Sequence, residues 1–347
     1  MGSCRFTRLF FLFLLGSLAT MVSCKPAAQT SGEGSQGQPG SSPTAPLPPR
    51  RETIWKDFDS EHSLQTAQTI LGLGNRIAGS DALNTVRAYI KKELVNSGWE
   101  VIEQHFSEPT AGGQEIQFCN LVAHLARVSP AEPRFLLAAH FDAPNLGIIV
   151  DPGATDGAAN TAVLLEIGRT LSLDPRLAAH VELVFLDGHM PFHELSLNDG
   201  LFGSRFFAQM LQIGQKTEVP AAAVVLENLG GGDSGLGFAP NSDPGLIDHF
   251  RAAAQSLKLG LQAGNRPFLL DHVPFSNASI PSIALLEPDA LYLNSADDNA
   301  SRLSRDAFAQ AGQLVLHFLD EQTNPSKPTP EKTALSGKGE RRTGQTN

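Results

Sequence analysis

Two apolar runs that end in charged side chains constrain the fold more than any other feature of this sequence. The run 135–142 ends in His140 and Asp142, and the run 181–187 ends in Asp187. Apolar runs of this length are typical of parallel strands that are buried on both faces. The carboxyl ends of such strands meet at one edge of a sheet, where ligands bind. The two runs therefore predict a parallel sheet whose edge gathers polar groups in a cleft.

Strand-like and helix-like patterns alternate along the chain after residue 135. Alternation of this kind indicates an α/β fold, with a mostly parallel sheet and helices on both faces. An earlier part of the chain adds two helices and two strands. The predicted strands are 99–106, 116–126, 135–142, 181–187, 221–228 and 280–286, and the predicted helices are 63–73, 82–97, 158–171, 200–211, 245–259 and 304–320.

The first 24 residues have the pattern of a secretory signal. Arg5 and Arg8 precede an apolar run, 9–18, that is short for a membrane span. The segment ends in Cys24, which resembles a bacterial lipoprotein signal, in which the cysteine is lipidated. We expect an exported lipoprotein of a bacterial envelope, anchored to the membrane through Cys24 and facing the periplasm or the cell surface. Plain secretion after cleavage near Ser23 is the alternative.

The composition divides the rest of the chain into a folded domain and two polar segments. Residues 25–50 are rich in Pro, Gly, Ser, Gln and Ala, and residues 324–347 are rich in Pro, Lys, Thr, Gly and Arg, so we expect a disordered tether and a disordered tail. Residues 51–323 have the size of one large α/β domain. The formal net charge of −10, without a basic patch in the domain, argues against nucleic acid as a partner.

Seven short motifs carry a more specific signal. Together they resemble the zinc aminopeptidase superfamily and, within it, the glutaminyl-peptide cyclotransferases, over residues 63–319. The resemblance implies a three-layer α/β/α sandwich with a mixed, mostly parallel central sheet. It also implies conversion of N-terminal glutamine to pyroglutamate at a single zinc, with peptide N-termini in the cleft. The motifs are Arg76–Ser80, His140–Asp142, Gly153–Gly157, Phe185–Gly188, Asp199–Arg205, Asp271–Phe275 and Asp297–Asn299.

The resemblance implies one retained zinc ligand and two altered ones. The family's Asp ligand falls on Asp156, its Glu ligand on Met190 and its His ligand on Asn294. A thioether is a poor zinc ligand, and a neutral carboxamide is an uncommon one. His189 takes the place of the glutamate that moves the proton in the family. Zinc is thus the cofactor that the resemblance implies, and Met190 and Asn294 argue against its binding.

Five side chains remain as candidates for the site. The resemblance places Glu227, where an Asp is usual, and Asp271 at two carboxylate positions, and we expect them with His189 as the catalytic candidates. His140 joins Asp156 as a metal-ligand candidate because it ends a predicted strand. A purely structural role stays open for each of these two residues. His140 could form a hydrogen bond with Asp142 or a loop carbonyl without binding metal, and Asp156 could cap the following helix.

These observations support three hypotheses about function. The first is a cyclotransferase-like protein with a degraded zinc site and weak or no cyclisation of N-terminal Gln peptides, that is, a pseudoenzyme. Leu195 and Leu293 fit this view, because they fall where the family has pocket tryptophans. The second is an active metal-dependent peptide-processing enzyme with a relocated ligand set. The third is a non-catalytic peptide-binding module.

Overall fold

The structure is a computed structural model, and it describes residues 47–110, 113–126, 128–147, 150–214 and 219–324. Contacts within the chain separate Met1–Ala45 from Pro46–Asn347, and the fold below is that of the second unit. The predicted signal, most of the tether and nearly all of the tail lie outside the described residues. Within the described residues, no helix is long and apolar enough to cross a bilayer.

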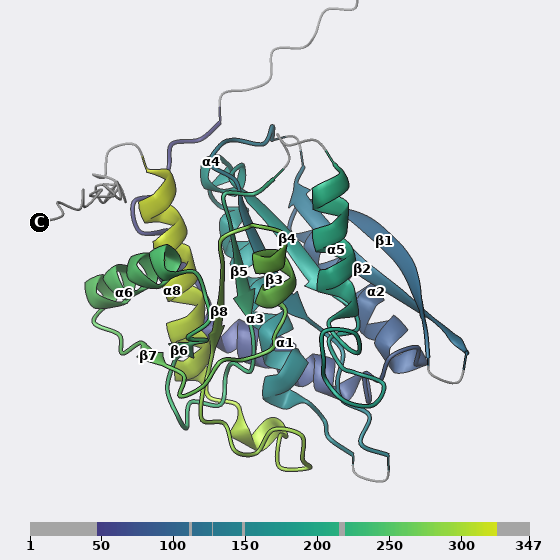
Figure 1. Cartoon of the computed structure of the whole chain (residues 1–347). Coiled ribbons are helices and arrows are strands. Elements are labelled where there is room, and N and C mark those ends of the chain that lie inside the picture. The colour runs from purple at the N-terminus through teal and green to yellow at the C-terminus, as the bar shows by residue number, and fades with distance from the viewer. Residues whose placement is uncertain (1–46, 111–112, 127, 148–149, 215–218, 325–347) are drawn as a thin grey trace, which may run out of the picture. The chain divides into compact units, whose positions relative to one another are not determined.

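One sheet of eight strands forms the middle layer of the described domain (Figure 1). The strands are β1 (Trp99–Pro109), β2 (Glu115–Leu125), β3 (Phe135–His140), β4 (Val181–Leu186), β5 (Ala222–Leu226), β6 (Gly237–Phe238), β7 (Gln262–Ala263) and β8 (Ser282–Leu286). Their order is β1-β2-β4-β3-β5-β8-β6-β7. Strands β4, β3, β5 and β8 are parallel, whereas the β1–β2 hairpin and the β6–β8 pair are antiparallel. The prediction of a mixed, mostly parallel sheet is confirmed.

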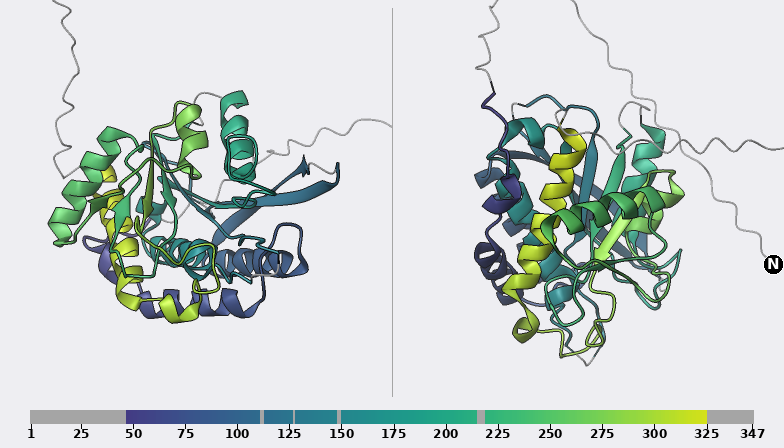
Figure 2. Two further views of the ribbon diagram at one scale, coloured as in Figure 1. Left: turned by 60° about the horizontal axis from the view of Figure 1, so that its bottom comes forward. Right: turned by 90° about the vertical axis from the view of Figure 1, so that its left-hand side faces the viewer.

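Helices cover both faces of the sheet. Helices α5 and α7 lie on one face, and α1, α2, α3 and α8 lie on the other (Figure 2). This arrangement is the three-layer sandwich that the resemblance implies. The helices are α1 (Ser60–Gly72), α2 (Asp81–Asn96), α3 (Asn160–Leu171), α4 (Pro175–Ala178), α5 (Phe202–Ile213), α6 (Pro244–Leu257), α7 (His272–Asn277) and α8 (Arg305–Thr323).

The all-apolar strand β3 contributes to two cores because its side chains alternate between the two faces of the sheet. Leu136 packs in a cluster with Phe207 of α5 and Phe275 of α7. Leu137 belongs to the larger cluster on the opposite face, with α1, α2, α3 and α8. Both leucines are almost fully buried, and burial of a leucine contributes about 1.5–3 kcal/mol. Packing on both faces therefore explains why the run lacks polar residues until His140.

Polar residues fix the starts of the long helices. The side chains of Asp59, Ser80, Asp243 and Ser304 accept backbone hydrogen bonds from the first turns of α1, α2, α6 and α8. Such caps satisfy backbone N–H groups that have no partner inside the helix. They explain why these helices begin within a few residues of the predicted positions.

The short elements α4, α7, β6 and β7 were not predicted. Strands β6 and β7 have two residues each, and α7 has six. Segments of this length are too short to show the repeat that distinguishes a helix from a strand.

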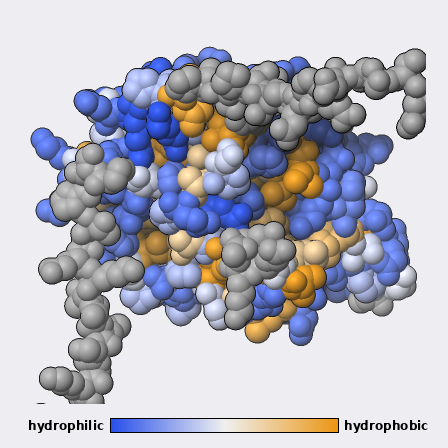
Figure 3. Space-filling model, turned by 90° about the horizontal axis from the view of Figure 1, so that it is seen from above, coloured by the Kyte–Doolittle hydropathy of each residue, from blue (hydrophilic) through white to orange (hydrophobic). Residues whose placement is uncertain are grey.

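Both ends of the described chain lie at the amino-terminal end of the parallel strands (Figure 1). Arg50 donates hydrogen bonds to the backbone oxygen and the hydroxyl of Thr323 and forms an ion pair with Asp320 near the end of α8. Seen from above, this end shows apolar patches between polar side chains (Figure 3). The carboxyl ends of the strands, where the polar groups gather, are at the opposite end of the sheet.

Candidate functional site

A cavity of about 570 Å³ lies at the carboxyl ends of the parallel strands. The loops that follow β3, β4, β5 and β8 line it, together with the segment before α7. Polar and apolar side chains are both present, as in most small-ligand sites. The lining residues include Asn145, Asp156, His189, Met190, His193, Glu194, Leu195, Asn228, Arg266, Phe268, Leu270, Leu293 and Asn294.

Glycine at position 188 lets β4 deliver His189 to the cavity. Gly188 follows the end of β4 with a φ of +81°, a region that residues with a side chain rarely adopt. A Cβ atom at this position would lie 2.7 Å from the Phe118 ring. The chain therefore turns sharply here, and the next side chain enters the cleft.

His140 lies at the centre of a buried cluster of carboxylates. Its Nε2 atom is 3.0 Å from Asp156 Oδ1 and 3.4 Å from Glu227 Oε2. Its Nδ1 atom is 3.4 Å from Asp142 Oδ1, an ion-pair contact without hydrogen-bond geometry. Burial lowers the pKa of His140, but these three carboxylates outweigh it and raise the pKa well above the ordinary value.

His189 stacks on His140 and bonds a different carboxylate. The ring centroids are 4.2 Å apart, with 20° between the planes. Nδ1 of His189 lies 2.8 Å from Asp271 Oδ2 and 3.8 Å from Glu227 Oε1. Burial and the charge of His140 lower the pKa of His189, yet Glu227 and Asp271 raise it to about 9. The surrounding carboxylates therefore favour the protonated form of both imidazoles, whose charge offsets part of the negative charge of the cluster.

The pKa values of the two carboxylates next to His189 shift in opposite directions. Burial raises the pKa of Glu227, and the neighbouring histidines only partly counteract this effect. Burial also favours the neutral form of Asp271, but His189 outweighs it and lowers the pKa of Asp271. Ser204 donates a 2.5 Å hydrogen bond to Asp271 Oδ1. Asp271 is thus an anion bound on both sides, between His189 and Ser204.

Asp142 shapes the loop that carries His189. Its two carboxylate oxygens accept the backbone N–H groups of His189 at 3.1 Å and Met190 at 2.9 Å. Hydrogen bonds from N–H groups to a carboxylate are among the stronger ones in proteins. Asp142, just after β3, therefore positions the loop that follows the neighbouring strand β4.

Asp156 is presented by a short π-helix, Ala154–Ala159, that precedes α3. The carboxylate of Asp298 holds this segment by accepting the backbone N–H groups of Thr155 and Asp156. The Asp156 side chain forms no helix cap, and α3 starts after it without a side-chain cap. The capping role that the sequence left open is therefore wrong. The carboxylate bonds His140 and borders the cavity instead.

Arg76 holds the loops that carry Asp142 and Asp156, a role that the sequence did not reveal. The residue is fully buried. Its guanidinium donates to the backbone oxygens of Phe141, Pro152 and Gly153. Burial lowers its pKa to about 10, and Asp142 and Asp156 oppose that effect. Arg76 therefore brings a positive charge to the cluster and ties the loop after β3 to the Asp156 loop.

The cyclase-type zinc triad does not fit this chain. The resemblance puts Asp156, Met190 and Asn294 at the three zinc-ligand positions. In the structure, all three residues line the same cavity. A thioether and a neutral carboxamide are nevertheless poor donors for zinc beside a single carboxylate. Two of the three positions therefore lack the chemistry that a zinc ion requires.

A second group has suitable donors in an unsuitable orientation. Donor atoms of His140, His189 and Glu227 lie within 4.8 Å of one another, and two histidines with a glutamate form a known zinc set. Asp156 is not in this group, although it contacts His140. An imidazole donates to a metal in its ring plane, so two nearly parallel stacked rings do not point at one ion. The His189 ring would have to turn and release Asp271.

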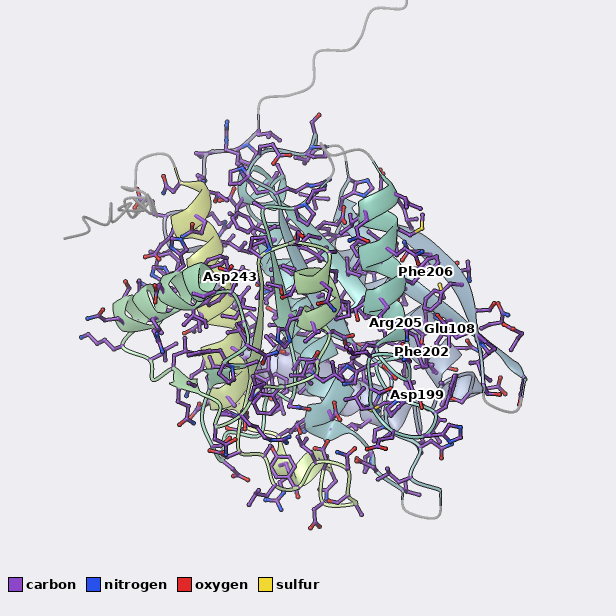
Figure 4. The ribbon with its side chains drawn as sticks, in the orientation of Figure 1. Glu108, Asp199, Phe202, Arg205, Phe206 and Asp243 are labelled. Atoms are coloured by element: carbon purple, nitrogen blue, oxygen red, sulfur yellow. The ribbon has the colours of Figure 1, made fainter. Side chains whose placement is uncertain are left out.

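The Asp199–Arg205 motif has an architectural role. The Asp199 carboxylate accepts the N–H groups of Phe192, His193 and Glu194. Arg205 lies over the Phe202 ring, 5.4 Å from its centroid, at the start of α5 (Figure 4). The motif therefore holds the loop that forms one cavity wall.

Comparisons with known proteins agree with this fold. The family model described as peptidase family M28 matches residues 120–319. A glutaminyl-peptide cyclotransferase of Bothrops jararaca is 26% identical over 294 residues, which cover 72% of this chain and 78% of that protein. A glutaminyl-peptide cyclotransferase-like protein of Mus musculus is 36% identical over 150 residues, covering 40% of this chain and 38% of that protein.

Solved structures show the same architecture. A Zn-dependent exopeptidase from Parabacteroides distasonis superimposes with a TM-score of 0.67 at 21% identity, covering 76% of this chain and 98% of that chain. Porphyromonas gingivalis glutaminyl cyclase gives a TM-score of 0.66 at 23% identity, covering 76% and 99%. The matched segment spans β3, β4, β5, β8 and most of α8, and it contains the histidine and carboxylate cluster. This chain is a glutaminyl-cyclase-like member of peptidase family M28.

Proposed function

We propose that this M28 protein binds peptide N-termini in its cleft and cyclises N-terminal glutamine weakly or not at all. The observation that carries the proposal is the donor set around Asp156, where Met190 and Asn294 stand at the positions of two zinc ligands. A zinc ion bound by Asp156 alone would be held weakly, because affinity depends on several deprotonated ligands acting together.

The state of His189 supports the same proposal. The resemblance puts a proton-transferring glutamate at this position. Nδ1 of His189 already donates a hydrogen bond to Asp271 across 2.8 Å. When the imidazole is protonated, it has no free nitrogen that could accept a proton from the substrate. Loss of a general base costs about 10²–10⁴-fold in rate. The cleft retains its acidic groups and its volume, which suit binding of a positively charged peptide N-terminus.

Turnover of a Gln-peptide tests the proposal. The purified domain, supplied with equimolar zinc, is incubated with a Gln-Gly-Gly amide, and pyroglutamate is followed by mass spectrometry. The expected rate equals that of the peptide in buffer. Pyroglutamate formation at the rate of a working enzyme, abolished by a chelator, would contradict the proposal.

A metal-dependent peptide-processing enzyme is the second candidate. The convergence of His140, His189 and Glu227 favours it, as do Glu227 Oε2 and His140 Nδ1, which are buried without a hydrogen-bond partner among the described residues. This candidate requires the His189 ring to leave Asp271 when metal binds. An Asp271→Asn variant would then bind zinc at least as tightly as the wild type, and a loss of zinc binding in it would contradict this candidate.

Export and anchoring form a separate part of the proposal, based on the sequence of residues 1–24. We expect Cys24 to carry a lipid that attaches the domain to an envelope membrane. Labelling of the full chain with radioactive palmitate in a bacterial host tests this expectation. Label on the wild type and its loss in Cys24→Ser support anchoring, whereas equal label on both proteins contradicts it.

A further inference from the structure

Both ends of the described chain leave the domain at the amino-terminal end of the parallel strands, opposite the cavity (Figure 1). At the first end, Arg176 of α4 donates a hydrogen bond to the backbone oxygen of Leu47 at 3.0 Å. At the other end, α8 finishes at Thr323. Residues 25–46 and 325–347 are therefore both attached to this one end of the domain.

Large apolar side chains are exposed at the same end. Ile213 is the last residue of α5 and is 70% exposed, and Met210, three residues earlier on the same helix face, is 40% exposed. Val219 lies just before β5 and Leu173 just before α4, and both are more than a third exposed. Figure 3 shows this end of the domain with apolar patches between polar side chains. Groups of exposed apolar residues commonly mark a contact with another surface.

The charge of the attached C-terminal segment indicates what that other surface is. Apolar exposure alone does not, because Leu197 and Leu291 are exposed at the cavity end. Residues 325–347 contain five Lys or Arg and two Glu, whereas the whole chain has a formal net charge of −10. An anionic surface therefore attracts the end of the domain that carries this segment and repels the acidic remainder.

An anionic lipid bilayer matches both features of this end. Its surface attracts basic segments by about 1 kcal/mol per Lys or Arg, and its interface accepts apolar side chains from a protein surface. The N-terminal segment adds proximity, since 22 residues separate Cys24 from Leu47 and a flexible chain of that length spans roughly 25 Å. A lipid on Cys24 would thus hold this end of the domain closest to the membrane.

We propose that the amino-terminal end of the sheet docks on anionic phospholipid membranes. Leu173, Met210, Ile213 and Val219, called the docking surface below, contact the bilayer interface. Residues 325–347 bind the headgroups, and the cavity opens away from the membrane. The inference goes beyond the proposed function, and it requires neither peptide binding nor a lipid on Cys24.

Cosedimentation with vesicles tests the docking without the lipid anchor. The protein is the chain from Lys25 to Asn347, because contacts within the chain place residues 1–24 outside the domain. Vesicles contain phosphatidylcholine alone or with one-third phosphatidylglycerol. Binding to the anionic vesicles is expected to be at least about tenfold tighter and to be lost in about 0.5 M salt. Equal binding to both vesicles, or binding to neither, would overturn the inference.

A chain that ends at Asn324 tests the basic segment. Its loss removes about three net positive charges, so affinity for the anionic vesicles should fall by about a hundredfold. The melting temperature should not change, because α8 remains complete. Unchanged affinity would remove the headgroup contact from the inference.

Paired serine substitutions test the apolar contact. Met210→Ser/Ile213→Ser should weaken binding to the anionic vesicles by about tenfold. Leu197→Ser/Leu291→Ser is the matched control, because these residues are 63% and 96% exposed at the cavity end, and its affinity should not change. Melting temperatures report whether each variant is folded. Equal affinities of the two variants would contradict docking through this surface.

The orientation of the domain on the membrane is tested with a fluorescent dye at a single introduced cysteine. Cys119 is buried, so the dye reacts with the new thiol of Ile213→Cys or of Leu291→Cys. Lipids that carry a nitroxide are expected to quench the dye at position 213 and to leave the dye at position 291 unquenched. Equal quenching at the two positions would show that the domain has no fixed orientation and would overturn the inference.

A second copy of the chain is the rival occupant of the docking surface. Sedimentation equilibrium without vesicles is expected to show a monomer. A dimer that Met210→Ser/Ile213→Ser dissociates would assign the docking surface to a second copy and overturn the inference. Lipidation of Cys24 is measured separately by palmitate labelling, so a failure of anchoring and a failure of docking are distinguishable.

Discussion

His189 donates a hydrogen bond from Nδ1 to the carboxylate of Asp271 across 2.8 Å, deep in the cleft. The direction follows from chemistry, because an ionised carboxylate only accepts. Ser204 donates to the other oxygen of Asp271. The pair therefore places a protonated imidazole among the carboxylates Glu227 and Asp271.

This pair predicts how stability depends on pH. The pKa of His189 is about 9 in the folded protein, against about 6.5 for an unfolded histidine. The raised folded-state value means that the contribution is fully present below pH 6.5 and is lost as pH rises through 9. The free energy of unfolding, measured by urea titration with a chelator present, should fall over this range by at most about 1.4 kcal/mol per pH unit from this group.

A His189→Gln variant isolates this contribution from other titrating groups. Glutamine can still donate to Asp271 but carries no charge. The difference in unfolding free energy between wild type and variant should shrink between pH 6.5 and 9. A difference that is constant across this range would show that His189 does not titrate there.

Arg76 predicts a large loss of stability on removal of its charge. Arg76→Met keeps the length of the side chain but removes the donors that Arg76 supplies to three backbone oxygens, and it removes a cation beside Asp142 and Asp156. Breaking a buried charge interaction of this kind costs about 3–5 kcal/mol. Urea unfolding at pH 7 measures the effect.

Arg51→Met is the control for Arg76, because Arg51 pairs with Asp57 at the surface, with both side chains more than a third exposed. Removal of a surface ion pair changes stability by less than about 1 kcal/mol. Similar losses in the two variants would contradict the structural role of Arg76.

Close packing at Gly203 predicts a third effect. A Cβ atom at this position would lie 2.5 Å from both Asn120 Oδ1 and the Asp187 backbone oxygen. Gly203→Ala should therefore push α5 away from the sheet and cost about 1–3 kcal/mol. Gly260→Ala is the control, since no atom lies within 4 Å of its added Cβ, and it should change stability by no more than about 0.5 kcal/mol. Equal thermal stability of both variants would contradict the packing argument.

Much of the fold follows from the sequence because the central strands are apolar on both faces. The runs that became β3, β4, β5 and β8 have no polar face, and only the middle of a layered sheet buries such strands. Strand β5 ends at Leu226, where the apolar run gives way to the charged residue Glu227. The pair β6–β7 could not be predicted in this way, because two residues such as Gly237 and Phe238 become a strand only when β8 lies beside them.

The residues of the site were predictable in part. His140, Asp156, His189, Glu227 and Asp271 were singled out from predicted strand ends or from the family resemblance, and the structure brings them into one cluster. Their catalytic and metal-binding roles stay predictions.

The supporting residues of the cluster were harder to find. Arg76 and Asp298 act through backbone contacts with segments far away in the sequence, and neither spacing nor residue type reveals such contacts. The stacking of His140 on His189 was likewise unpredictable, because it depends on the turn at Gly188.

Zinc stoichiometry tests the central claim most directly. The wild-type domain and a Met190→Glu/Asn294→His variant are purified identically, incubated with excess zinc, desalted and analysed by inductively coupled plasma mass spectrometry. The account predicts much less than one zinc per wild-type chain and a clear gain in the variant, whose Asp, Glu and His would restore the family's ligand set. One tightly bound zinc per wild-type chain, with Gln-peptide cyclisation, would contradict it.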